Sequence, residues 1–410
     1  MSNKQAVITG LGVIAPNGIG KEAFWQALKK GKTGIKPISL FDTTFFKVKT
    51  AGECSDFKVE DFLGTRGLRN LDRATTLVCS AAKLALEDAN LNVTEENSDD
   101  IGVATAITLS VSSDLAKFTK EQVEVGPRFV NPALFPPTTM NFPSSQLSIR
   151  YKLKSFNTTI STGYTASLDA LKYATEFIRL GRSKAVLVAG VECLSFSGYS
   201  GFYKIGFLAG LKGEELSCPF DARHNGIVLG EGAGVLIVED EDYARKRGAN
   251  IYAKVLSGAS TFDAYRTSKY TPRATGLQIS MTEALAKAGL SEDHIDYISA
   301  SANSVSQHDK LESAVIKNVF NIYAKKIPVT SIKSMLGESV SASGCLQVIA
   351  AIGAMKQGFV PPTINYKEKD SECDLDYVPN KARKQNIDNV LINNFGPGGN
   401  NTTAIISNYE

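Results

Sequence analysis

The sequence has no long apolar run, and it carries little excess charge. No stretch reaches the roughly 18 apolar residues that a membrane-spanning helix needs. The N-terminus enters a predicted strand without the apolar segment of a signal peptide. A net charge of +3 is small for 410 residues and argues against a nucleic-acid-binding protein. We therefore expect a cytoplasmic protein that has neither a membrane nor a nucleic-acid partner.

The residues that most often bind metals are few and scattered. The six cysteines show no metal-ligand spacing, and we expect buried, reduced thiols. The three histidines also lack a ligand pattern. His294 lies between a predicted helix and a strand, which favours a surface or capping role. His224 and His308 are assigned to polar loops, where a structural role is favoured over a functional one. The sequence predicts no metal site.

Short β-rich apolar runs alternate with helical patterns along the whole chain, which predicts an α/β fold. Two series of such elements indicate a duplicated unit, with halves at residues 1–248 and 249–410. Both halves contain a buried strand that is expected to run into a glycine turn, at Gly190 and Gly396. The predicted strands are 5–9, 101–106, 185–189, 251–256, 295–300, 390–393 and 403–407. The predicted helices are 74–90, 168–178, 277–288, 310–320 and 348–355.

A glycine-rich segment near the N-terminus looks at first like a nucleotide-binding motif. Gly10-Leu-Gly12 follows the first predicted strand, as in a dinucleotide-binding fingerprint. That fingerprint needs a helix to begin within the loop, whereas here Pro16-Asn17-Gly18 favours another turn. We therefore interpret Gly10-Leu-Gly12 as a turn that binds no cofactor.

Five segments, spread in order over nearly the whole chain, resemble the β-ketoacyl-acyl-carrier-protein synthase family. They are residues 7–18, 218–232 (beginning Cys-Pro-Phe-Asp-Ala-Arg), 333–337 (Lys-Ser-Met-Leu-Gly), 361–365 (Pro-Pro-Thr-Ile-Asn) and 394–399 (Asn-Phe-Gly-Pro-Gly-Gly). The resemblance implies the thiolase fold. This is a five-layered αβαβα arrangement of two duplicated α/β halves, and its members are normally dimeric.

The resemblance also shows which catalytic groups this chain lacks. Family members use a cysteine thiolate at a helix N-terminus and two histidines that assist decarboxylation of a malonyl unit. Here the cysteine position falls on Tyr164, and the histidine positions fall on Ser301 and Glu338. A phenol with a reference pKa of about 10 cannot replace the thiolate, and a carboxylate would repel the developing enolate. Pro397 removes a backbone donor from the oxyanion turn. The sequence therefore predicts a chain that does not catalyse condensation.

Type II polyketide synthases pair an active ketosynthase with a cysteine-less homologue, the chain-length factor. Residues 126–141 resemble the corresponding segment of these factors, although better-known factors carry glutamine where this chain has Tyr164. The resemblance implies a heterodimer with an active ketosynthase, acting on a poly-β-ketoacyl chain held by an acyl carrier protein in polyketide biosynthesis. Phosphopantetheine enters only as part of the carrier protein, and no other cofactor is expected.

The family's tunnel-gating helix lies just before residue 126 in this sequence. Its gate positions fall on Ser112, Leu115 and Thr119, with Phe118 as the neighbour that a shift of one residue would bring in. Large side chains there shorten the cavity by filling it. Because Ser112 and Thr119 are small, we expect a long tunnel and a long product. The alternative is an ordinary amphipathic helix whose small face packs on a neighbour.

In the family, the strand before the nucleophile pairs with its counterpart in the other subunit. Here that strand covers about residues 156–161, and we assign Phe156, Thr158 and Ile160 to the dimer interface. The β-branched residues in this run suit a strand that becomes central in a dimer.

Two alternatives are retained. One is an acyltransferase-type enzyme with a serine nucleophile, Ser161 or Ser301, activated by Glu338 or Lys333 as the base. The other is a cysteine-less partner subunit in a reducing synthase that makes polyenes or fatty-acid-like chains.

Overall fold

The computed structural model describes residues 4–266 and 269–409. Its main sheet has two halves, which meet where Val7 and Ile8 of β1 pair with Lys254 and Ala253 of β9. The first half runs in the order β6 (Asn157–Ile160), β5 (Ile101–Ala106), β7 (Ala185–Glu192), β8 (Gly232–Asp240) and β1 (Ala6–Ala15). The second half runs β9 (Ala253–Phe262), β15 (Asn400–Asn408), β14 (Asn389–Phe395), β10 (Tyr297–Ser299) and β11 (Val329–Thr330).

The remaining elements within the described residues are twelve α-helices, seven short 3₁₀ helices and five short strands. The helices are α1 (Lys21–Lys29), α2 (Glu60–Leu63), α3 (Arg73–Asp88), α4 (Val111–Val125), α5 (Phe142–Tyr151), α6 (Ala166–Arg179), α7 (Phe196–Lys204), α8 (Glu241–Lys246), α9 (Thr275–Ala288), α10 (Ser306–Phe320), α11 (Lys333–Leu336) and α12 (Ser343–Gln357). The short strands are β2 (Gly18–Ile19) on β1, β3 (Ile35–Pro37) with β4 (Thr50–Gly52), and β12 (Phe359–Val360) with β13 (Arg383–Lys384).

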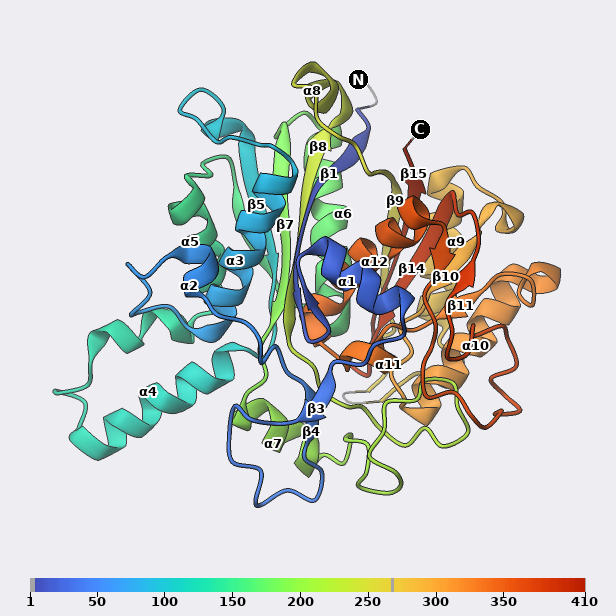
Figure 1. Cartoon of the computed structure of the whole chain (residues 1–410), viewed down its shortest axis with the longest axis horizontal. Helices are drawn as coiled ribbons and strands as arrows, with labels where there is room; N and C mark the ends of the chain where they lie inside the picture. The colour runs from blue at the N-terminus through green and yellow to red at the C-terminus, as the bar shows by residue number, and fades with distance from the viewer. Residues whose placement is uncertain (1–3, 267–268, 410) are drawn as a thin grey trace.

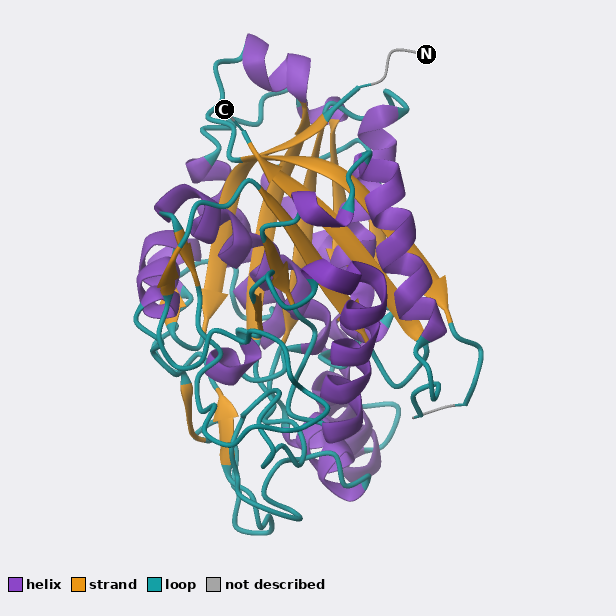
Figure 2. Cartoon of the chain, turned by 90° about the vertical axis from the view of Figure 1, so that its right-hand side faces the viewer, coloured by secondary structure: helices purple, strands orange, loops and turns teal. Residues whose placement is uncertain are grey.

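Helices and sheets alternate in five layers (Figures 1 and 2). Helix α3 covers β1, β7 and β8 on one outer face, and α9 covers β9 and β15 on the other. Helices α6 and α12 contact strands of both halves and therefore form the middle layer. This is the predicted thiolase-like αβαβα fold. Strand β9 begins shortly after the proposed boundary at residue 248, and the division into halves 1–248 and 249–410 stays a prediction.

The middle layer explains why α12 is apolar on every side. All its residues from Ser343 to Met355 are buried, because sheets lie on both sides of the helix. The indole Nε1 of Trp25 on α1 donates to the Ile349 carbonyl at 2.8 Å. A side chain at Gly353 would clash with that indole, since a Cβ there would lie 2.3 Å from Trp25 Cδ1.

The interpretation of Gly10-Leu-Gly12 as a turn is wrong, because β1 continues through it to Ala15. The pairing with β8 shifts register between Ile8 and Gly10, which marks a bulge. Glycine is needed because helix α3 crosses closely: a Cβ on Gly12 would lie 1.8 Å from the Ala81 carbonyl oxygen. The expected turn at Gly190 is also absent, since β7 runs on to Glu192. The other predicted strands and helices are present, with ends shifted by a few residues.

All six cysteines lie within the described residues, where each is free and buried. Among residues 4–266 and 269–409, no helix is both long and apolar enough to cross a membrane. Within the same residues, no group of three or more His, Cys, Asp or Glu side chains is placed to hold a metal ion.

Candidate active-site region

Tyr164 occupies the junction between β6 and α6. It lies in a single 3₁₀ turn, Gly163–Thr165, directly before α6 begins at Ala166. The side chain is buried, with 6% exposed, and its ring packs so closely on Gly396 that a Cβ there would lie 3.0 Å from Tyr164 Cδ2. Burial, followed by the negative charge of Glu338, raises the pKa of the Tyr164 phenol well above its usual value. The phenol therefore stays protonated and cannot serve as a ready nucleophile.

Glu338 forms a buried ion pair with Lys333. The Lys333 Nζ lies 2.8 Å from Glu338 Oε2, and both side chains are at most 3% exposed. Asn303 Nδ2 donates to the same oxygen at 3.0 Å. The other carboxylate oxygen accepts from Val340 N at 2.9 Å and from the Ser343 hydroxyl at 2.8 Å. Because four donors surround this carboxylate, it is a structural anchor rather than a free base.

Ser301 lies beside a histidine that the sequence analysis assigned to a polar loop. That assignment is wrong: His308 is on the first turn of α10, which begins at Ser306, and it is fully buried. Its Nε2 lies 3.1 Å from Ser301 Oγ, and its Nδ1 lies 2.9 Å from the Tyr270 hydroxyl. The imidazole stacks on Phe395, with ring centroids 3.8 Å apart. Burial, followed by the positive charge of Lys333, lowers the pKa of His308 well below its usual value, so the ring is neutral.

The sequence predicted Glu338 or Lys333 as the base for a serine nucleophile. In the structure the imidazole beside the Ser301 hydroxyl is that of His308. Lys333 Nζ reaches the carbonyl oxygen of Ser301 at 2.8 Å, not its hydroxyl. The backbone N–H groups of Ser301 and Ala302 donate to Glu312 at 2.9 and 2.8 Å. Burial raises the pKa of Glu312 to about 7. The only signal for His308 in the sequence was its position seven residues after Ser301, which becomes informative once α10 is known to start at Ser306.

His224 lies in a loop, as predicted, and its side chain is buried. Its Nδ1 lies 3.0 Å from Asp309 Oδ2, and Asp309 also accepts from the backbone N–H of Phe220 and Asn303. This histidine therefore joins the loop around Asp221 to the start of α10, which is a structural role. His294 lies at the surface, as expected.

Pro397 lies at the mouth of the region. Gly396, Pro397 and Gly398 line a cavity of about 320 Å³ together with Tyr164 and Val340. The Gly396 N–H is already used, since it donates to the Asn400 carbonyl at 3.1 Å, and Pro397 has no N–H to offer. Ser161 also lines this cavity and is exposed. The turn is thus without the backbone donor that an oxyanion would need at Pro397.

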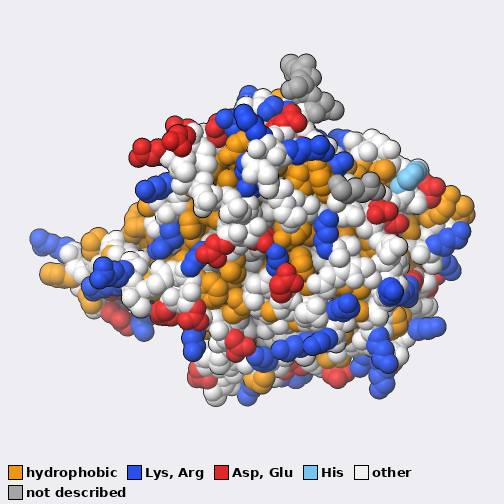
Figure 3. Space-filling view, turned by 45° about the horizontal axis from the view of Figure 1, so that its top comes forward, with side chains coloured by type: hydrophobic (Ala, Val, Ile, Leu, Met, Phe, Trp, Pro, Cys, Tyr) orange, Lys and Arg blue, Asp and Glu red, His pale blue; other side chains and the backbone are white. Residues whose placement is uncertain are grey.

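The four predicted tunnel positions lie on α4, which projects from the body of the chain at the left of Figure 1. None of the described residues of α4 is buried, and Leu115 is 51% exposed. Ser112 and Phe118 are half-buried, whereas Thr119 is exposed. The Phe118 ring contacts Phe135, with centroids 5.8 Å apart. In the space-filling view, hydrophobic side chains are visible on this projection among basic ones (Figure 3).

Strand β6 is the edge strand of the first half. The Phe156 carbonyl accepts from Val103 N at 2.8 Å, and the Ile160 carbonyl accepts from Ile107 N at 3.2 Å. Because backbone groups alternate along a strand, the N–H and C=O of Thr159 face away from β5. No strand of the described part of the chain pairs with that outer side.

The three side chains predicted for the dimer interface turn toward the middle layer. Phe156 packs on Tyr173 and Phe177 of α6, with ring centroids 5.6 and 4.3 Å apart. Ile160 packs on the central core, and Thr158, two residues from each, lies on the same face. At its outer edge this strand therefore presents backbone N–H and C=O groups rather than the side chains of Phe156, Thr158 and Ile160.

The described geometry defines a thiolase-fold protein with a buried phenol, Tyr164, directly before α6. Two family models match the chain, "Beta-ketoacyl synthase, N-terminal domain" over residues 3–244 and "Beta-ketoacyl synthase, C-terminal domain" over residues 252–367. The chain belongs to the β-ketoacyl synthase family.

Its relatives include 3-oxoacyl-(acyl-carrier-protein) synthases and a polyketide synthase subunit. It is 36% identical to 3-oxoacyl-(acyl-carrier-protein) synthase 2 of Coxiella burnetii, over 99% of each chain. It is 35% identical to the tetracenomycin polyketide synthase ketoacyl synthase alpha subunit of Streptomyces glaucescens, over 99% of this chain and 97% of that one. Among solved structures, the ishigamide ketosynthase/chain length factor superimposes with a TM-score of 0.93 at 31% identity, covering 100% of both chains. A type II PKS acyl-carrier protein in complex with its ketosynthase gives a TM-score of 0.92 at 29% identity over the same share.

Proposed function

We propose that this chain is a non-catalytic, chain-length-factor-like subunit that pairs with an active ketosynthase and shapes the cavity for a growing poly-β-ketoacyl chain on an acyl carrier protein. The observation that carries the proposal is Tyr164, a buried and protonated phenol at the nucleophile position. The Glu338–Lys333 pair supports it, because four donors already occupy the Glu338 carboxylate and leave it unsuited to act as a base. The likeness to the ishigamide ketosynthase/chain length factor is in line with this role.

The test is co-expression with an active ketosynthase, followed by intact-mass analysis after incubation with acyl-loaded carrier protein. We expect a one-to-one complex in which only the ketosynthase becomes acylated. The Tyr164→Phe variant should give the same result, because it keeps the ring and removes the hydroxyl. An acyl group on the wild-type chain that disappears in Tyr164→Phe would overturn the proposal.

A second candidate function is supported by the Ser301–His308 contact. A serine hydroxyl 3.1 Å from a neutral imidazole is an arrangement that serine acyltransferases use. Both side chains are fully buried, so an acyl thioester would reach them only after the residues that cover them move. In the same mass experiment, acylation that is lost in Ser301→Ala and retained in Tyr164→Phe would establish this function. Acylation of neither chain variant would exclude it.

The assignment of α4 as the tunnel gate is tested separately. In the complex, Ser112→Trp and Thr119→Trp should each shorten the released product, because an indole would occupy cavity volume. Lys117→Trp is the matched control, since Lys117 lies about 140° around the helix from Ser112 and its side chain is 66% exposed. Equal product lengths from all three variants would contradict the gate assignment.

A further inference from the structure

Glu192 is a buried carboxylate that the fold leaves without a counter-charge. It is the last residue of β7, and 3% of it is exposed. Within residues 4–266 and 269–409, no lysine, arginine or histidine lies within ion-pair distance of it. Burial raises the pKa of this carboxyl above its usual value. Because a buried carboxylate without a counter-charge costs free energy, we looked for what its hydrogen bonds connect.

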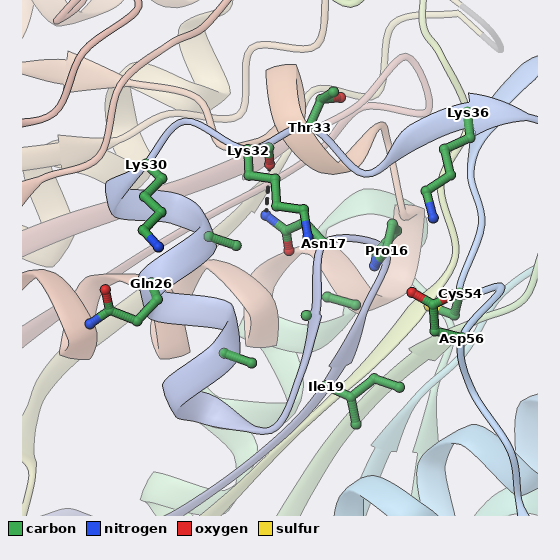
Figure 4. A pocket seen from close by; sticks show the side chains of 14 residues that line it. Pro16, Asn17, Ile19, Gln26, Lys30, Lys32, Thr33, Lys36, Cys54 and Asp56 are labelled. Carbon is green, nitrogen blue, oxygen red and sulfur yellow. Dashed lines mark hydrogen bonds between the residues drawn. The ribbon is translucent and has the colours of Figure 1, made fainter.

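Glu231 shows the more usual arrangement close by. Its carboxylate pairs with Arg73 and accepts from the backbone N–H of Cys54 at 2.9 Å and of Leu194 at 3.1 Å. Cys54 is labelled in Figure 4, at the wall of a cavity of about 360 Å³ that Glu192 does not line. Glu231 thus fixes two loops to a charged partner, whereas Glu192 is held by uncharged donors alone.

The donors to Glu192 come from two separate parts of the chain. Its Oε1 accepts from the backbone N–H of Leu109 at 3.1 Å and from the Ser110 hydroxyl at 2.5 Å, directly before α4 begins. Its Oε2 accepts from the Ser341 hydroxyl at 2.6 Å. Ser341 lies in the 3₁₀ turn Val340–Ala342, directly before α12 begins. The carboxylate therefore joins the start of the projecting helix α4 to the start of the central helix α12.

The turn that contains Ser341 has a strained backbone. Val340 has a φ of 43°, in the left-handed region that β-branched residues rarely adopt. Such a conformation persists only where the surrounding contacts hold it in place. Here the Val340 N–H donates to Glu338 at 2.9 Å, and the Ser341 hydroxyl donates to Glu192. Two buried carboxylates thus hold two successive residues of this turn.

Leu109 and Val340 line the same cavity, the one of about 320 Å³ beside Tyr164. Both also line a smaller cavity, of about 20 Å³, whose wall includes Glu192 itself. We infer that Glu192 is a positioning residue that holds Leu109 and Val340 in a fixed relation and so sets the width of the cavity between them. The inference deepens the proposed function, and only its consequence for an acyl chain rests on that function.

The experiment is hydrogen–deuterium exchange of the full chain, read by mass spectrometry of its peptides. Ser341→Ala removes a donor on the α12 side only, because the hydroxyl and carbonyl of Ser341 bond to β7 and α6 and not to the described residues of α4. If Glu192 couples the two sides, exchange in residues 109–115 should still rise about fivefold, as expected for residues that share one hydrogen-bond network. Ser110→Ala should likewise raise exchange in residues 340–345.

The matched control is Ser257→Ala. Ser257 is equally buried, and its hydroxyl donates to the Ala284 carbonyl at 2.7 Å in the other half of the sheet. This variant should leave exchange in residues 109–115 and 340–345 as in the wild type. Glu192→Gln keeps the size of the side chain and loses one acceptor oxygen, so it should raise exchange in both segments.

Wild-type exchange in residues 109–115 of Ser341→Ala, in a chain whose other peptides also exchange normally, would overturn the inference. The proposed function is tested separately, in the complex with an active ketosynthase, where Ser341→Ala should broaden the range of product lengths. Coupled exchange together with wild-type product lengths would support the positioning role of Glu192 and count against the proposed function.

Discussion

Removing the Glu338 carboxylate should be among the most destabilising single changes in this chain. In Glu338→Ala the buried Lys333 ammonium keeps one partner, the Ser301 carbonyl, and loses its counter-charge. The donors of Asn303, Val340 and Ser343 lose their acceptor as well. Loss of one partner of a buried ion pair costs about 3–5 kcal/mol of the free energy of unfolding. Since neither side chain is more than 3% exposed, we expect a loss in this range.

The assay is urea denaturation followed by the fluorescence of Trp25. This single tryptophan lies on α1 and packs against the buried α12, so it reports on the middle layer where α12 lies. The matched control is Glu283→Ala, which removes a 3.2 Å contact to Lys287 between side chains that are 49% and 54% exposed. That exposed helix pair should contribute about 0.5 kcal/mol or less.

A double variant distinguishes an unpaired charge from lost packing. Lys333→Met/Glu338→Ala leaves no charge behind, so it should be more stable than Glu338→Ala alone. If Glu338→Ala denatured at the same urea concentration as the Glu283→Ala control, or if the double variant were less stable than the single one, the reasoning would be refuted.

Three further predictions concern other parts of the chain. Gly12→Ala should lower the thermal midpoint markedly, because the new Cβ would lie 1.8 Å from the Ala81 carbonyl oxygen, whereas Gly201→Ala, with no atom within 4 Å of its new Cβ, should leave the midpoint unchanged or raise it. Burial raises the pKa of Glu312 from 4.5 to about 7 in the folded chain. Its contribution to the free energy of unfolding should therefore be lost as the pH rises from about 4.5 to 7. Urea titrations at both pH values should show this loss in the wild type and not in Glu312→Gln. Thr159→Pro removes an outward backbone donor of β6 and leaves the pairing with β5 in place. It should therefore weaken the complex with a ketosynthase in sedimentation experiments and leave the thermal midpoint nearly unchanged. An intact complex would argue against pairing at this edge.

The fold could be predicted from the sequence largely because local patterns and the family resemblance agreed. The segment 101–106 is predicted and found as a strand with the same ends, and the helix predicted at 277–288 begins at Thr275. Strand β8 and helices α1 and α5 were not predicted, and the two predicted turns that proved wrong both lie at glycines. Gly12 and Gly190 were interpreted as turn residues, but their role is to let α3 and α6 approach a strand. The local sequence indicates that glycine is required at these positions, but it does not indicate whether a turn or a neighbouring helix is the reason.

The proximity of the predicted site residues could be inferred from the sequence, but their hydrogen bonds could not. Tyr164, Ser301 and Glu338 come from ordered motifs, and the structure brings them around one region. Their assignment as former catalytic positions stays a prediction. The Ser301–His308 contact was missed because helix boundaries are the least reliable part of such predictions, and this contact depends on where α10 begins. Among the donors to Glu338, Lys333, Val340 and Ser343 lie within five residues of it, whereas Asn303 lies 35 residues away and no local pattern encodes that contact.

The interior of this region explains how a synthase-fold chain with a tyrosine directly before α6 remains well packed. Catalytic groups are usually kept imperfectly paired, since they must exchange protons or bonds with a substrate, and that costs stability. Here the Glu338 carboxylate is opposed by Lys333, the His308 imidazole is bonded at both nitrogens, and the Tyr164 ring fills the space beside Gly396. Substitutions at these positions should therefore change the free energy of unfolding of this chain. If the proposed role is correct, these substitutions should lower the turnover of a ketosynthase partner only to the extent that they unfold this chain. Loss of partner turnover with a fully folded Tyr164→Phe variant would instead indicate that Tyr164 takes a direct part in the chemistry.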